Sequence, residues 1–227
     1  MRKPKIQLAV IDMAGTTVAD DGLVVSAFDA AATAAGLPED GPDREQARQY
    51  VLDTMGQSKI VVFRALFGTE ELAQRANTEF ERAYADLIAN GQAAPIDGAA
   101  DSITELRDAG IRVALTTGFS GATQDKLLAA LGWHGLADLV LAPGDGVRGR
   151  PYPDLILAAL IRLQADGVAN VAALGDTTSD VESARRAGVA IAAGTLTGAH
   201  DEEQLRGAGA THVVGSITDF ADLLLHG

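Results

Sequence analysis

Near its N-terminus the chain reads Ile6-Gln7-Leu8-Ala9-Val10-Ile11-Asp12-Met13-Ala14-Gly15-Thr16-Thr17. The apolar run up to Ile11 predicts a buried β-strand, and Asp12 stands where that strand ends. The turn-forming residues after it predict a loop at the carboxyl end of the strand. A buried strand followed by a polar loop is typical of the first strand of a parallel α/β sheet. We therefore expect the remaining sequence to hold further strands of such a sheet and the helices that connect them.

Similar short apolar runs recur later in the chain. They predict strands at residues 111–115, 139–141, 171–174, 189–192 and 212–214. Helical patterns fall between or beside them at residues 96–109, 123–131, 155–163, 179–187 and 217–225. Strands that alternate with helices indicate an α/β fold with a doubly wound parallel sheet.

The stretch between the first strand and the rest carries no clear strand pattern. Its apolar spacing predicts helices at residues 24–31, 46–54, 58–67 and 70–90. We therefore expect an inserted, all-helical cap domain at residues 18–92. The core domain would then comprise residues 1–17 and 93–227.

Composition excludes several classes of function. The 227 residues carry 18 Lys and Arg against 31 Asp and Glu, a formal net charge of −13 that repels nucleic acid. The absence of cysteine excludes disulfides, thiol nucleophiles and Cys-ligated metals. No apolar run reaches the ~18 residues of a membrane span. The short basic start at Met1–Leu8 is unlike a secretory signal, so we expect a cytoplasmic protein.

Polar residues stand at the carboxyl ends of the predicted strands, where open parallel sheets bind ligands. The set comprises Asp12, Thr116, Thr117, Arg150, Asp176 and Asp180. Carboxylates suit Mg²⁺, and a hydroxyl with a guanidinium suits phosphoryl oxygens. One carboxylate is then left to act as a nucleophile. Asp176 or Asp180 alone could equally cap the following helix, but the joint pattern indicates phosphoryl chemistry.

This joint pattern resembles the four motifs of the haloacid dehalogenase (HAD) superfamily. Asp12–Thr17 resembles the first motif, Thr116 the second, Arg150 the third and Gly175–Asp180 the fourth. The helical insert stands where that superfamily places a C1-type cap. The resemblance covers essentially the whole chain, and it implies a Rossmann-like core and Mg²⁺ as the cofactor.

The resemblance also implies roles for individual residues. Asp12 would accept the phosphoryl group, while Thr116 and Arg150 would hold its oxygens. The implied metal ligands are Asp12, the backbone carbonyl of Ala14, Asp176 and, directly or indirectly, Asp180. The implied substrate-binding residues are Gly15, Thr117, Gly118, Met55 and Gly56.

Two departures narrow the resemblance to one branch. Ala14 stands where most superfamily phosphatases have a second Asp as general acid, and Arg150 stands where most have Lys. The phosphonoacetaldehyde hydrolase (phosphonatase) branch shares both features. The segment Met55–Lys59 resembles its M-G-x-x-K motif, whose lysine forms a Schiff base with the substrate aldehyde. A C–P bond leaves as a carbanion, which a protonated imine can accept, so such an enzyme needs an amine more than an acid.

Other residues depart from that branch. Val62 replaces a His, Met13 replaces a Trp beside the nucleophile, and Phe119 replaces a Tyr. The chain thus looks like a phosphonatase-like sister group. By itself Lys59 could also be a solvated helix residue, but a purely structural cation in this sequence is more often Arg.

We therefore expect a Mg²⁺-dependent hydrolase that transfers a phosphoryl group from a small carbonyl-bearing phosphonate to Asp12. The alternative is a phosphate monoester such as phosphoglycolate, for which Lys59 would supply only a charge. A non-enzymatic phosphorylated receiver domain would lack an insert of about 70 residues. The expected partner is a small phosphonate or phosphate, and the sequence leaves a homodimer through the cap open.

Overall fold

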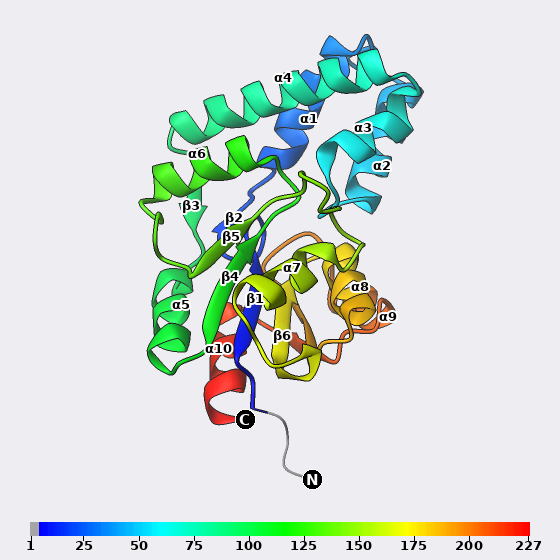
Figure 1. Ribbon diagram of the computed structural model, residues 1–227. Coiled ribbons are helices and arrows are strands. Elements are labelled where there is room, and N and C mark those ends of the chain that lie inside the picture. Colours follow the sequence, from blue (N-terminus) through cyan, green and yellow to red (C-terminus); the bar gives the residue numbers. More distant parts are fainter. Residues whose placement is uncertain (1–4) are drawn as a thin grey trace.

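A computed structural model describes residues 5–227, and these form a parallel sheet below a group of helices (Figure 1). Residues 1–4 of the expected core segment, which are half of the basic start Met1–Leu8, lie outside the described residues. The sheet has the strand order β5-β4-β1-β6-β7-β8, and every neighbouring pair is parallel. Its strands are β1 (Leu8–Asp12), β4 (Arg112–Thr116), β5 (Leu139–Leu141), β6 (Val171–Gly175), β7 (Ile191–Thr195) and β8 (His212–Val214).

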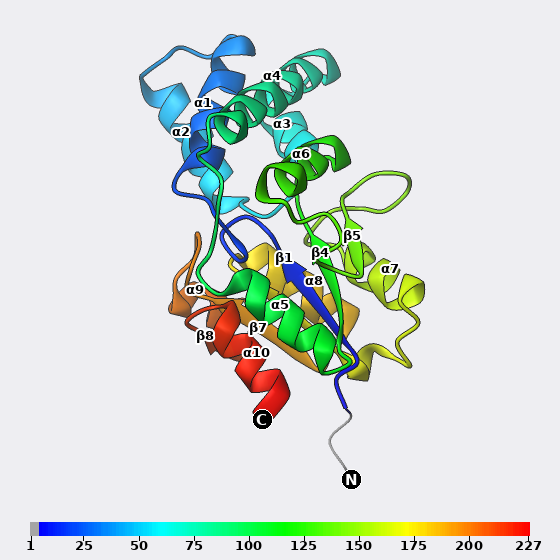
Figure 2. The same cartoon turned by 90° about the vertical axis from the view of Figure 1, so that its left-hand side faces the viewer.

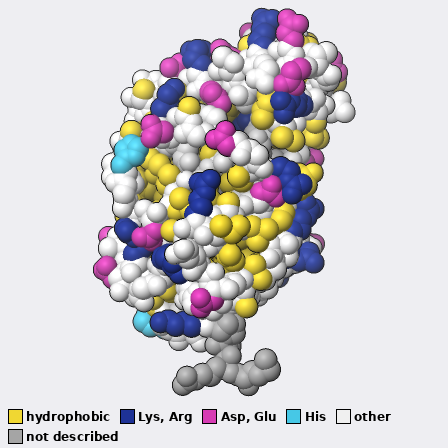
Figure 3. Space-filling model, viewed as in Figure 1, with side chains coloured by type: hydrophobic (Ala, Val, Ile, Leu, Met, Phe, Trp, Pro, Cys, Tyr) yellow, Lys and Arg dark blue, Asp and Glu magenta, His cyan; other side chains and the backbone are white. Residues whose placement is uncertain are grey.

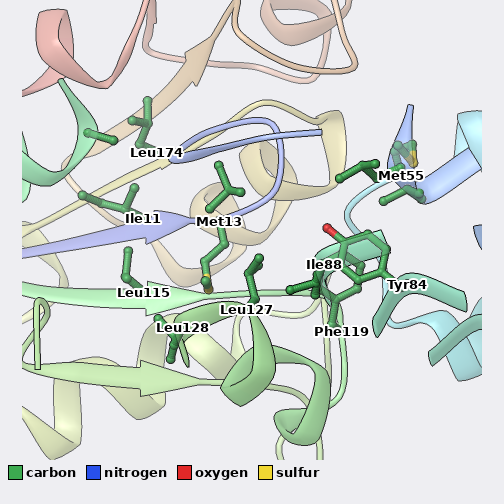
Figure 4. Close-up of a cluster of buried hydrophobic side chains, with 14 of the residues drawn as sticks. Ile11, Met13, Met55, Tyr84, Ile88, Leu115, Phe119, Leu127, Leu128 and Leu174 are labelled. Atoms are coloured by element: carbon green, nitrogen blue, oxygen red, sulfur yellow. The ribbon is translucent and has the colours of Figure 1, made fainter. Parts of the chain in front are cut away.

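Helices cover both faces of this sheet, which confirms the doubly wound α/β fold (Figure 2). Alternating strand residues supply the two cores: Ile11 and Leu115 enter one cluster, whereas Val10 and Ala114 enter the other. Figure 4 shows part of the first cluster, with Ile11, Leu115 and Leu174 side by side. The first face carries α5 (Ala99–Asp108) and α10 (Ile217–His226), and the second carries α7 (Asp154–Arg162) and α8 (Thr178–Ala187). The other core elements are α6 (Gly121–Leu131), a 3₁₀ turn (Val168–Asn170) and α9 (Glu202–Gly207).

The expected helical insert lies beyond the carboxyl edge of the sheet (Figure 1). Its helices are α1 (Leu23–Ala34), α2 (Pro42–Asp53), α3 (Lys59–Phe67) and α4 (Glu70–Ala89). Gly68, with φ 69°, ends α3, and the Thr69 hydroxyl accepts a hydrogen bond from the Leu72 N–H to begin α4. The chain enters and leaves the insert through two short antiparallel strands, β2 (Val18–Ala19) and β3 (Ala94–Pro95). The domain limits at 17/18 and 92/93 and a homodimer through the insert stay predictions.

The element bounds differ from the sequence prediction in a few places. The strand predicted at 189–192 instead occupies Ile191–Thr195, and the helix predicted from residue 96 begins at Ala99. Neither α9 nor the β2–β3 pair was predicted. Gly194 weakens the strand signal of β7, but the structure explains it: a Cβ there would lie 2.9 Å from Leu205 of α9.

The surface in Figure 3 mixes acidic and basic side chains, and apolar atoms gather around α7, whose Ile161 is 71% exposed. Across residues 5–227, none of the helices has both the length and the apolar character that crossing a membrane requires.

Candidate active site

The carboxyl edge of the sheet brings the predicted polar residues together. Asp12, at the end of β1, is the register partner of Thr116 at the end of β4. On the other side of β1, Ile11 pairs with Leu174, so β6 delivers Asp176 to the same edge. Parallel strands end on one side of a sheet, and this places residues from distant parts of the chain within contact.

Arg150 joins three of these residues. Its Nη2 donates a hydrogen bond to Thr116 Oγ1 at 2.6 Å and lies 2.6 Å from Asp12 Oδ1. Its Nε lies 2.6 Å from Asp180 Oδ1. All four residues are buried, so these charge-assisted contacts are strong and fix the guanidinium in one orientation.

Asp180 combines a capping role with its contact to Arg150. Its Oδ2 accepts hydrogen bonds from the backbone N–H and the hydroxyl of Thr177, at 3.1 and 2.5 Å. The Thr177 hydroxyl in turn accepts from the Asp180 N–H, which forms a capping box at the start of α8. Both carboxylate oxygens of Asp180 are therefore held by donors of this chain.

Asp176 is held from two sides. Its Oδ1 accepts from the Thr16 hydroxyl at 3.2 Å, and its Oδ2 accepts from the Ala199 N–H at 2.8 Å. A Cβ at Gly15, which has φ +81°, or at Gly198 would clash with this carboxylate. The two glycines therefore let the backbone approach Asp176 closely.

Three buried carboxylates, those of Asp12, Asp176 and Asp180, offer oxygens that lie within 4.8 Å of one another. When all three carboxylates are ionised, their charge of −3 and the +1 charge of Arg150 leave an excess of −2. Burial raises the pKa of Asp12, and burial together with the charge of Asp180 raises the pKa of Asp176 to about 7. Hard oxygen donors with an excess charge of −2 fit a divalent cation, so this cluster could hold a metal ion.

A cavity of about 370 Å³ opens above this cluster. Most of the predicted site residues line it, namely Asp12, Ala14, Met55, Gly56, Lys59, Thr117, Gly118, Arg150 and Asp176. The other predicted residues, Gly15, Thr116 and Asp180, lie behind the wall. Thr116 and Asp180 hold Arg150, and the Gly15 carbonyl accepts a hydrogen bond from the Thr197 hydroxyl at 2.7 Å.

Lys59 is the first residue of α3 and points its amine into an apolar part of the cavity. The side chain is only 8% exposed, and Nζ lies 5.8 Å from the ring centre of Phe80 and 5.7 Å from that of Phe119. Among the described residues, no carboxylate oxygen lies within 4.0 Å of Nζ. Burial, only partly opposed by Asp20 and Asp12, lowers the pKa of Lys59 to about 8.

The loop that precedes Lys59 lies directly against the core. A Cβ on Gly118 would lie 2.7 Å from the carbonyl oxygens of Gly56 and Gln57, and one on Gly56 would clash with the Thr177 hydroxyl. Arg150 Nη1 also donates a hydrogen bond to the Gly56 carbonyl at 3.4 Å. The glycines permit this close contact, which brings the insert and the sheet edge together around one cavity.

The sequence analysis missed part of the cavity wall. Asp20, Asp21 and the segment Thr197–Ala199 also line it. Thr197–Ala199 follows β7. Because the sequence predicted that this strand ends at residue 192, the segment was not expected at the carboxyl edge of the sheet. Asp20 sits eight residues after Asp12, where the first loop gives way to the insert, and no motif marked it. His200 Nδ1 accepts the Thr178 N–H at 2.8 Å and so caps α8.

The sequence model of haloacid dehalogenase-like hydrolases matches residues 6–188. The chain belongs to this family. It is therefore an enzyme of the HAD-like hydrolases, as the motif pattern predicted, and the matched residues include the buried Asp cluster at the sheet edge.

Individual relatives confirm the resemblance to the phosphonatase-like branch. A phosphonoacetaldehyde hydrolase from Pseudomonas putida is 30% identical over 206 residues, which cover 82% of this chain and 71% of the relative. A probable phosphatase, IndB, from Dickeya dadantii is 29% identical, with 93% of this chain and 90% of the relative covered. The structure of a phosphonoacetaldehyde hydrolase-like protein from Oleispira antarctica shares the fold, with a TM-score of 0.80, 23% identity, and coverage of 99% of this chain and 96% of that one.

Proposed function

We propose that this HAD-like hydrolase is Mg²⁺-dependent, forms a phosphoaspartyl intermediate on Asp12 and cleaves the C–P bond of a small carbonyl-bearing phosphonate. The observation that carries the proposal is the amine of Lys59, which is buried in the same cavity as Asp12 and has a pKa of about 8. A neutral amine is therefore available near neutral pH to attack a carbonyl carbon.

The residues divide the reaction between two ends of the cavity. Lys59 adds to the substrate carbonyl, and loss of water leaves a protonated imine. Asp12 then attacks phosphorus, the C–P bond breaks, and its electron pair moves into the imine to give an enamine. Water hydrolyses the phosphoaspartate and supplies the proton that the enamine carbon takes up. A second water releases the carbonyl product and restores the free amine.

The remaining residues of the site orient the phosphoryl group. Arg150 binds its oxygens and keeps the Asp12 carboxylate in place, while Thr116 and Asp180 fix the guanidinium. Asp12, Asp176 and the Ala14 carbonyl would hold Mg²⁺, which when bound supplies positive charge to the phosphoryl oxygens. Asp180, whose oxygens are both held by donors of the chain, acts through Arg150.

Reductive trapping tests the proposal. Borohydride with phosphonoacetaldehyde should fix an adduct on the peptide that contains Met55–Arg64, located by mass spectrometry. The exposed Lys126 on α6 is the internal control and should stay unmodified. Asp12→Asn should fold and still form the adduct, but phosphate release should fall by several orders of magnitude because an amide cannot attack phosphorus. Activity within tenfold of wild type in that variant would contradict the role of Asp12.

A second candidate is a phosphomonoesterase acting on a substrate such as phosphoglycolate. The similarity to a probable phosphatase over nearly the full length of both chains favours it. Lys59→Arg separates the two functions, because Arg keeps the charge but forms no imine. It should abolish C–P cleavage if the amine reacts, and it should retain much of the activity if the substrate is an ester. If no adduct forms and Lys59→Arg turns over at the normal rate, C–P cleavage through an imine is ruled out and the phosphomonoesterase function remains.

A further inference from the structure

The proposed reaction requires a proton donor for the oxygen that leaves the carbonyl carbon as water, and a proton acceptor for the water that later adds there; the residues at the sheet edge do not supply these. Arg150 stays protonated at any relevant pH, and Ala14 offers only a methyl group. The carboxylates at the sheet edge serve phosphorus and the metal. Two further acidic residues line the cavity without a role so far, Asp20 and Asp21.

Asp20 is held in place where the chain enters the insert. Its Oδ1 accepts a hydrogen bond from the Val24 N–H at 3.2 Å, at the start of α1. The next two residues, Asp21 with φ 40° and Gly22 with φ 81°, have left-handed backbone conformations and turn the chain into the helix. Asp20 is half-buried, whereas Asp21 is exposed. Asp20 is thus the positioned and shielded carboxyl group of the pair.

Asp20 and Lys59 line one cavity and act on each other electrostatically. Asp20 is the strongest of the charges that oppose the fall in the pKa of Lys59, ahead of Asp12. Burial in turn raises the pKa of Asp20, and the ammonium of Lys59 counteracts that rise. The nitrogen and the carboxylate oxygens are more than 4.0 Å apart, so the two groups form no ion pair. Both residues line the cavity of about 370 Å³ in which the substrate carbonyl would bind.

We propose that Asp20 is the acid–base residue for the carbonyl half of the reaction. The proposal rests on the proposed function of Lys59. Addition of the Lys59 amine to the carbonyl gives a carbinolamine. Asp20 donates its proton to the carbinolamine hydroxyl, which leaves as water, and a protonated imine remains beside the ionised carboxylate. After C–P cleavage, water adds to the imine carbon, and Asp20 takes back the proton that this addition releases. With the two waters of the proposed reaction and the proton that the enamine carbon takes up, each cycle thus restores both groups.

The test compares Asp20→Asn with Asp21→Asn, a neighbouring variant with the same change in charge. Asn keeps an oxygen that can accept the Val24 N–H, so α1 can still begin at the same place. Two measurements are made: the rate of borohydride-trapped adduct formation on Lys59 with phosphonoacetaldehyde, and the hydrolysis of 4-nitrophenyl phosphate. The ester has no carbonyl, and its leaving group needs no proton.

Asp20→Asn should form the adduct about 10²-fold more slowly, as expected for loss of a general acid. Its hydrolysis of 4-nitrophenyl phosphate and both activities of Asp21→Asn should stay within about threefold of wild type. If Asp20→Asn does not fold, Asp20→Ser, which also provides a capping oxygen, takes its place.

Adduct formation at the wild-type rate in the Asp20 variant would overturn the proposal. Equal losses on both substrates would also overturn it, because Asp20 would then serve the phosphoryl site or the fold. If the wild-type protein itself forms no adduct but hydrolyses the ester, the function proposed for Lys59 fails and the role of Asp20 falls with it.

Discussion

Arg150 Nη2 lies 2.6 Å from Asp12 Oδ1, and both side chains are buried at the carboxyl edge of the sheet. The same guanidinium holds Thr116 and Asp180, and it reaches the Gly56 carbonyl in the insert. Only a planar group with several fixed donors can make these contacts together. Arg150 therefore fixes the position of the proposed nucleophile, and under the proposed function it would also bind the phosphoryl oxygens.

Replacement of Arg150 by Lys should lower kcat/KM by about 10²-fold, since one ammonium cannot hold Asp12, Thr116 and Asp180 at once. Steady-state phosphate release measures the effect. Arg148→Lys is the matched control, because Arg148 lies on the same loop but is exposed and pairs with Asp154. A loss of the same size in the control would show that the loop, and not the guanidinium at Asp12, determines the rate.

The variant Ala14→Asp should raise the hydrolysis of unactivated phosphate esters, because the added carboxyl group can protonate an alkoxide. The gain should reach at most the ~10²–10⁴-fold that general acid catalysis provides. Hydrolysis of 4-nitrophenyl phosphate, whose leaving group needs no proton, should change little. If the folded variant gains nothing on unactivated esters, the shape of the cavity rather than a missing acid limits ester turnover.

Acetylation of Lys59 by acetic anhydride, which needs no acid catalyst, should depend on pH with an apparent pKa of about 8. Only the neutral amine attacks a carbonyl, and the neutral form increases as pH rises through the pKa. The initial rate of acetylation, measured by mass spectrometry, should therefore rise about tenfold per pH unit below 8 and level off above it. An exposed lysine would level off near pH 10 instead. A midpoint there would mean that the amine is not buried in solution.

The hydroxyl of Tyr84 is fully buried, and within residues 5–227 it has no hydrogen-bond partner. Its ring centre lies 4.6 Å from that of Phe119, and Figure 4 shows the two rings together beside Ile88. A buried hydroxyl without a partner costs about 1–3 kcal/mol. Tyr84→Phe should therefore raise the free energy of unfolding by about 1 kcal/mol in urea titrations. A loss of stability would show that the hydroxyl is bonded in solution.

Much of the site could be predicted because each central residue follows a strand of the parallel sheet. The positions of Asp12, Thr116 and Asp176 could be predicted from the strand ends alone, because parallel strands end at one edge of the sheet. The capping interpretation of Asp180 is confirmed, since one oxygen accepts from Thr177, whereas its functional role stays a prediction although the other oxygen contacts Arg150. Periodicity cannot show both contacts, because it gives the element on which a side chain lies but not its partners.

The unpredicted parts of the site depend on tertiary contacts. Gly194 made β7 seem to end early, which hid Thr197–Ala199, although the glycine is required by the packing of Leu205. Asp20 carries no motif, and only the placement of the insert over the sheet brings it to the cavity of Lys59. The aromatic wall behind Lys59 combines Phe80 from α4 with Phe119 from the core, residues far apart in the sequence.

The short pairing of β2 with β3 determines where the helical insert could be exchanged for another one. Val18 pairs with Pro95 and Ala19 with Ala94, so the points at which the chain departs from the core and rejoins it are adjacent in space. A turn of a few residues could close that gap without displacing β1 or β4. The four helices between them can thus be exchanged as a unit, and a new insert grafted at Ala19 and Ala94 would bring different residues over an unchanged proposed phosphoryl site.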